Sequence, residues 1–84
     1  MHQDVKHTIR TFILSQYLQG ESPANVGDDL RLISSGLLDS LATLELAGFV
    51  QQAFGVKLSA TDLLADSFDR IEDIARLVAR KRAA

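Results

Sequence analysis

Asp39 and Ser40 form an adjacent acid and hydroxyl pair in the segment GLLDSL (residues 36–41), and an apolar helical pattern begins directly after them. Both residue types are preferred at the N-cap of a helix, so either side chain could simply start this helix. The serine could instead carry a phosphate ester, because free N–H groups and the positive end of the helix dipole favour an anion there. Asp39 could then help to position Mg²⁺ during phosphoryl transfer, since this ion prefers carboxylate and phosphate oxygens. The local pattern leaves both interpretations open.

The helix that would position Ser40 is predicted over residues 40–54, ending before Gly55. At 100° per residue its side chains divide into two faces. The face expected to pack on the core contains Thr43, Leu46, Ala47, Val50 and Phe54. The opposite face carries Leu41, Leu44 and Gly48, with Glu45 beside them. These leucines are either isolated exposed side chains, which are common, or a small apolar contact patch next to the serine.

Another long helix is predicted over about residues 4–19, before Gly20 stops it. Its apolar face comprises Val5, Ile9, Phe12, Ile13 and Tyr17. The irregular segment that follows is long for a small domain. We expect it to fold back on the core through Leu30, Leu32 and Ile33.

Two capping boxes predict the remaining helices. Ser59 and Asp62 have the required spacing and introduce a short helix near residues 60–66. Asp69 and Glu72 have the same spacing and start a last helix, with Asp69 as its cap. The predicted fold class is therefore all-α, a four-helix bundle of three longer helices and a short third one.

The composition bounds the function as well as the fold. The chain has 84 residues, enough for a single domain over 1–84 with a modest core, and it has no cysteine. The span from Glu21 to Asp73 holds ten acids and three bases, a balance of −7, which argues against nucleic acid as a partner. Four bases between Arg76 and Arg82 suit the C-terminus of a helix. No membrane-spanning run or signal peptide is visible, so we expect a cytoplasmic protein without membrane insertion.

A hydrolase is the first alternative, with Ser40, Asp39 and either His7 or His2 as a triad. Adjacent Asp and Ser residues at a helix start do not give the geometry around a central histidine that a triad requires, so we do not expect an enzyme. A helical protein-interaction domain without a prosthetic group is the second alternative. A helix-turn-helix DNA-binding protein is the third, and the acidic middle of the chain disfavours it.

The segment LISSGLLDSL (residues 32–41) resembles the attachment motif of acyl carrier and peptidyl carrier proteins. The resemblance extends over the whole chain, through LELAGFVQQAFGVKL, a short third helix and a fourth helix led by a phenylalanine. It implies that Ser40 accepts a 4′-phosphopantetheine arm from coenzyme A, placed there by a separate phosphopantetheinyl transferase that uses Mg²⁺. The thiol of the arm would hold an acyl or aminoacyl group as a thioester. No metal site of the chain's own is implied.

The resemblance also implies partners. These are the transferase, an acyl- or aminoacyl-loading enzyme and a downstream acyltransferase or condensing enzyme, met by a monomeric carrier. We expect a partner surface of Asp39, Leu41, Leu44 and Glu45, of which the last three match positions where the family meets its enzymes.

Fatty-acid carriers that resemble this chain have a run of acids on the second helix, whereas this helix has Gln51, Gln52 and Ala53 there and Glu45 as its one acid. Gly48 also replaces a bulkier residue. These departures favour a stand-alone carrier in a dedicated lipid, polyketide or peptide-type pathway over a housekeeping role.

Overall fold

The protein is described from a computed structural model that covers residues 2–83, with side chains for residues 4–64 and 66–83. Its helices are α1 (His2–Tyr17), α2 (Ser40–Phe54), α3 (Ala65–Phe68) and α4 (Ile71–Ala83). Two 3₁₀ turns, η1 (Pro23–Asn25) and η2 (Thr61–Leu63), lie in the connections. Residues 2–83 contain no strand, and none of their helices is long and apolar enough to cross a membrane. The predicted all-α fold with four helices is confirmed.

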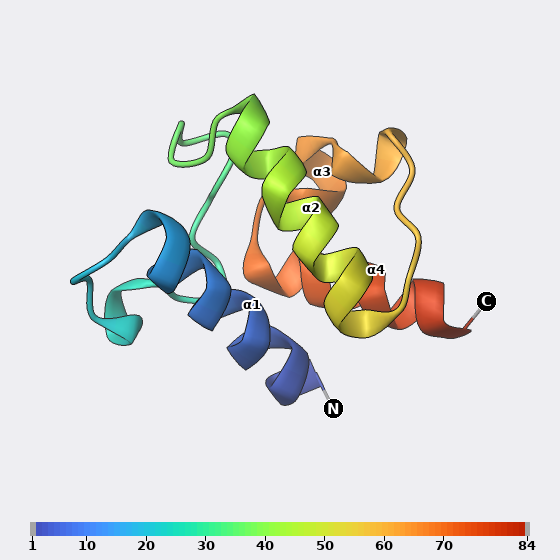
Figure 1. Cartoon of the computed structure of the whole chain (residues 1–84), viewed down its shortest axis with the longest axis horizontal. Coiled ribbons are helices and arrows are strands. Elements are labelled where there is room, and N and C mark those ends of the chain that lie inside the picture. Colours follow the sequence, from blue (N-terminus) through green and yellow to red (C-terminus); the bar gives the residue numbers. More distant parts are fainter. Residues whose placement is uncertain (1, 84) are drawn as a thin grey trace.

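The helices pack around one core. α1 contacts both α4 and α2, and α3 contacts α4. Figure 1 shows α2 crossing the front of the molecule with α4 behind it, while the long loop runs from the end of α1 to the end of the molecule where α2 begins. The fully buried aliphatic side chains include Ile9, Ile13, Leu46, Val50, Ile74 and Leu77, and they come from all three long helices. Burial of this apolar surface is the main stabilising contribution.

The loop between η1 and α2 is held to the core, as expected. Leu32 is fully buried, and Leu30 and Ile33 are partly buried against the core. The structure adds two buried anchors that the sequence pattern did not indicate, Val26 and Leu38. A connection anchored in this way can present the start of α2 in a defined position.

The first part of the same loop is also tied to two helices through Asp28. The side chains of Lys6 and Arg10 on α1 both bond to the carboxylate of Asp28, the former at 3.0 Å. The backbone carbonyl of Asp28 accepts the N–H of Glu72 on α4 at 3.1 Å. Lys6 and Arg10 thereby hold the pKa of Asp28 below its usual value, with the bond from Lys6 as the largest cause.

Two predicted elements differ from the structure. The short third helix is divided into η2 and α3, although the N–H of Ser59 does bond to Asp62 as its capping box requires, at 2.8 Å. The second capping box is wrong. Asp69 directs its carboxylate to the loop at Ile33 and Ser34, and Glu72 pairs with arginines. Sequence spacing alone could not show that a more distant set of donors captures Asp69.

Candidate functional site

The start of α2 is capped by Asp39. Its backbone is extended (φ −82°, ψ −174°), and its carboxylate oxygen Oδ1 accepts the N–H of Ala42 at 2.8 Å. Its carbonyl oxygen accepts both the N–H and the hydroxyl of Thr43, at 2.9 and 2.8 Å. The interpretation in which the Ser40 side chain caps this helix is therefore wrong. Ser40 is the first residue of the helix itself.

The Ser40 side chain is exposed, and no hydrogen bond joins its hydroxyl to any other part of the described chain. Asp39 occupies the N–H groups of Ala42 and Thr43, whereas those of Ser40 and Leu41 have no acceptor within residues 2–83. A helix N-terminus with such N–H groups favours an anionic substituent. The arrangement therefore suits a serine that carries a phosphate ester.

A groove of about 630 Å³ lies beside Ser40. One wall is the start of α2, and the other walls come from the preceding loop and from η2. Its lining comprises Ile33, Gly36, Leu38, Asp39, Ser40, Thr43, Leu44 and Leu63. Most of these side chains are apolar, so the groove can receive the apolar part of a substituent attached to the serine.

The predicted division of α2 into two faces is confirmed. Thr43, Leu46, Ala47 and Val50 are buried and Phe54 is partly buried, as expected for the core face. On the opposite face Leu41 is 66% exposed and Leu44 is 60% exposed. A Cβ atom added at Gly48 would meet no atom within 4 Å, so the surface is open there.

Two further leucines are exposed on the segments that border the groove. Leu37, in the loop next to Gly36, is 40% exposed, and Leu64, next to Leu63, is 61% exposed. Helical periodicity identified Leu41 and Leu44 but could not find these two, because neither lies in a long helix. Four large apolar side chains are therefore exposed on the elements around Ser40.

Glu45 lies one turn beyond Ser40, and its carboxylate is bound by α1. The hydroxyl of Tyr17 lies 2.9 Å from Glu45 Oε1 and 3.3 Å from the carbonyl oxygen of Ala42. Burial, followed by the hydrogen bond and charge of Glu45, raises the pKa of Tyr17 to about 12. The position of the Glu45 carboxylate is therefore fixed by a neutral donor on α1.

The triad considered for a hydrolase is not assembled by the residues that the structure describes. His7 is exposed on α1, where it lines a surface hollow with Phe12 and Phe49. The Asp39 carboxylate bonds to a backbone N–H of its own helix. The side chain of His2 lies outside the described residues.

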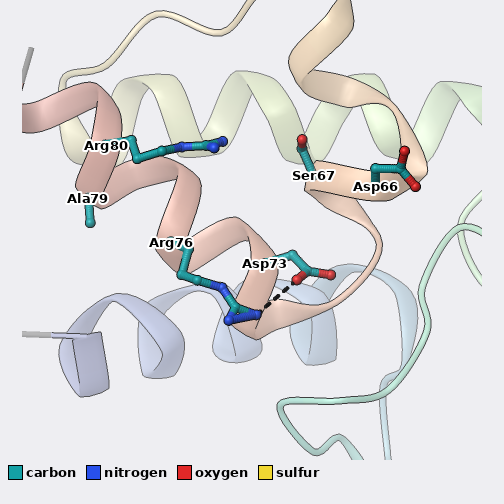
Figure 2. A pocket seen from close by; sticks show the side chains of 6 residues that line it. All are labelled: Asp66, Ser67, Asp73, Arg76, Ala79 and Arg80. Carbon is teal, nitrogen blue, oxygen red and sulfur yellow. Dashed lines mark hydrogen bonds and ion pairs between the residues drawn. The ribbon is translucent and has the colours of Figure 1, made fainter.

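A separate hollow of about 350 Å³ lies between α3 and α4. It shares no lining residue with the groove beside Ser40. Figure 2 shows Arg80 directed toward Ser67, and Arg76 bonded to Asp73 at 3.1 Å. Asp66 contributes a further carboxylate. Its lining contains two arginines and two carboxylates, so its charges largely compensate one another.

Comparison with family models gives a match over residues 13–78 to the model described as a phosphopantetheine attachment site. The matched range contains all of α2, α3 and the loop before α2. Comparison with curated protein sequences gives no match.

Proposed function

Because the chain belongs to the phosphopantetheine attachment family, whose members are non-catalytic carrier domains, we propose that Ser40 is the residue to which the 4′-phosphopantetheine arm is attached. The observation that carries this proposal is the position of Ser40. Ser40 is the first residue of α2, and its side chain is exposed and does not cap the helix, because Asp39 does so instead. Its hydroxyl oxygen would become the ester oxygen of the attached phosphate.

The residues around Ser40 fit such a group. The N–H groups of Ser40 and Leu41 would face the phosphate, and the positive end of the α2 dipole favours its charge. The apolar groove would receive the arm or its cargo along Leu44 and Leu63. The arm supplies a thiol on which an acyl or aminoacyl group can be held as a thioester.

We also propose that Asp39, Leu41, Leu44 and Glu45 form the surface by which partner enzymes recognise the carrier. The two leucines are exposed, and both carboxylates remain outside the ion pairs of residues 4–83. The partners would be a phosphopantetheinyl transferase that uses Mg²⁺, a loading enzyme and a downstream acyltransferase or condensing enzyme. The carrier would meet each of them as a monomer.

A dedicated lipid, polyketide or peptide-type pathway is the further proposal. α2 has Glu45 as its one acid and exposes Gln52 and Ala53, where fatty-acid carriers have acids. Gln51 is not available to a partner in the same way, because its side-chain oxygen accepts the N–H of Leu58 at 2.9 Å. The arrangement suits enzymes that do not depend on an acidic α2.

Intact mass spectrometry after incubation with coenzyme A and a broad-specificity transferase tests the attachment. Wild type should gain the mass of one phosphopantetheine group, and Ser40→Ala should gain none. Ser15→Ala is the control, because Ser15 is an exposed serine on α1, outside the loop that leads to Ser40, and should leave modification intact. A wild-type protein that is never modified, or modification that survives in Ser40→Ala, would overturn the proposal.

A further inference from the structure

Among the described residues, Asp69 alone binds residues 32–34, in the part of the loop that leads to Ser40, to the body of the domain through several hydrogen bonds. Asp69 lies between α3 and α4 and is 3% exposed. Its backbone carbonyl accepts the N–H of Leu32 at 2.7 Å. Its carboxylate oxygen Oδ1 accepts the N–H groups of Ile33 and Ser34, at 2.7 and 2.9 Å. The other oxygen, Oδ2, accepts the hydroxyl of Ser34 at 2.6 Å.

This set of bonds satisfies a buried charge, which would otherwise be costly. Arg31 adds a guanidinium 3.5 Å from Oδ2, but it is 65% exposed and contributes little. Burial is the largest single influence and raises the pKa of Asp69. The hydrogen bonds from Ser34 and Ile33, with the Arg31 charge, outweigh it and leave the pKa below its usual value. Asp69 is therefore a carboxylate at neutral pH, and it holds the loop as a charged acceptor.

The fastened residues connect directly to the site. Ile33 lines the groove beside Ser40, and Leu38 closes the loop on itself by donating its N–H to the carbonyl of Leu32 at 2.8 Å. Between them Gly36 turns the chain at φ +84°, where its N–H bonds to the carbonyl of Ile33 at 3.0 Å. Asp39 follows Leu38 and caps α2. The loop from Leu32 to Leu38 is thus a closed unit with Asp69 at one end and the serine at the other.

We propose that Asp69 is a positioning residue for Ser40: its carboxylate holds the loop at Ile33 and Ser34, and thereby keeps the groove wall and the serine in the arrangement that a transferase binds. This inference rests on the proposed attachment at Ser40. Asp69 does not itself line the groove and makes no hydrogen bond with Ser40; it reaches the groove through Ile33. Without its bonds the loop would sample other arrangements, and only a fraction of molecules would present the serine correctly.

The proposal predicts a specific kinetic signature. A carrier that is only fractionally competent is recognised with an apparent affinity reduced by that fraction, whereas the bound complex reacts normally. The variant Asp69→Asn should therefore raise the KM of the transferase for the carrier about tenfold and leave kcat within about twofold. A tenfold change corresponds to about 1.4 kcal/mol, which is within the range for hydrogen bonds to a charged group.

The test compares three variants by transferase kinetics and by amide hydrogen exchange on the unmodified protein. Asp73→Asn is the matched control, because Asp73 is a nearby aspartate whose carboxylate bonds to Arg70 and Arg76 and not to the loop. Ser34→Ala removes one bond from an exposed side chain and is expected to fold normally. Asp69→Asn should speed exchange at Ile33 and Ser34 about tenfold relative to the α1 core amides, with Ser34→Ala intermediate and Asp73→Asn unchanged.

The outcomes separate the positioning role from a merely structural one. If Asp69→Asn lowers the melting temperature but leaves the KM of the folded carrier and the loop exchange unchanged, Asp69 only stabilises the fold and the proposal is wrong. Equal effects of Asp69→Asn and Asp73→Asn would also refute it. If Asp69→Asn does not fold, unchanged exchange and KM in Ser34→Ala would overturn the proposal. If wild type is never modified, the proposed function fails, while the exchange measurement still decides whether Asp69 fastens the loop.

Discussion

Leu44 and Leu46 lie two residues apart on α2, and the structure predicts opposite consequences for truncating them. Leu46 is fully buried, whereas Leu44 is 60% exposed and lines the groove beside Ser40. A buried leucine replaced by alanine typically costs about 2–5 kcal/mol, because the transfer energy is lost and a cavity is left. Less than half of the Leu44 side chain is buried, so Leu44→Ala should cost about 1 kcal/mol or less.

These costs can be compared with the stability of the whole domain. At roughly 0.05–0.15 kcal/mol per residue, a chain of this length has a free energy of unfolding of about 4–13 kcal/mol. Leu46→Ala should therefore lower the urea midpoint strongly, and Leu44→Ala should shift it little. Circular dichroism during urea titration measures both.

The functional effect should run the other way. Only a minority of interface residues, those central to the contact, cost more than about 1 kcal/mol on truncation. We expect Leu44 to be one of them, so Leu44→Ala should lower the kcat/KM of modification at least about fivefold. Leu46→Ala, assayed at low temperature where it remains folded, should be modified at close to the wild-type rate. If the two variants lose equal stability, the assignment of the α2 faces is refuted. If Leu44→Ala is modified as wild type is, Leu44 does not belong to the partner surface.

Three further predictions follow from the charges and hydrogen bonds. Tyr17 is the one tyrosine of the chain, so ultraviolet titration should show its ionisation near pH 12 in the folded protein. The free energy of unfolding should decrease as the pH rises from about 10 through 12. A normal titration midpoint near 10 would contradict the Glu45 contact. Four aspartates have pKa values below the usual one, namely Asp28, Asp62, Asp69 and Asp73, and the pKa of Asp62 is about 2. The stability that they contribute is therefore present above about pH 4 and lost as the pH falls toward 2. The urea midpoint of unfolding should fall over this range, and it should fall less in Asp73→Asn. Gln52→Glu should improve binding to a condensing enzyme of general fatty-acid synthesis at low salt, and the gain should be lost at high salt. Gln51→Glu should improve this binding less, because the side chain at position 51 contacts Leu58. If wild type already binds as tightly as the variants, a dedicated pathway is contradicted.

Much of the fold follows from local patterns in the sequence. The buried face of α2 could be read from helical periodicity, since Thr43, Leu46, Ala47 and Val50 recur at the spacing of a helix and are buried. The bond from Ser59 to Asp62 spans three residues and follows from a capping rule. The prominence of Ser40 came from its place at a helix start and from the family resemblance.

The contacts that define the site in detail are long-range and carry no local signal. Asp69 meets Ile33 across 36 positions of the chain, and Tyr17 meets Glu45 across 28. A capping rule assigned Asp69 to its own helix because the rule compares only neighbours in sequence. The identity of the α2 cap was likewise undecided between Asp39 and Ser40, because both side chains can cap and only the backbone geometry selects one.

The net charge counted from the sequence also differs from the charge that a partner would meet in the structure. Of the ten acids between Glu21 and Asp73, five are in ion pairs, namely Asp28, Asp62, Asp69, Glu72 and Asp73. The balance of −7 therefore overstates the field that a partner meets, because paired charges largely cancel at a distance. Asp39 and Glu45 are not among the pairs of the described residues, and both lie on or next to the first turns of α2. Two of the five acids outside these pairs therefore lie beside Ser40, the other three being Glu21, Asp29 and Asp66, and these two can attract a basic enzyme surface toward the serine.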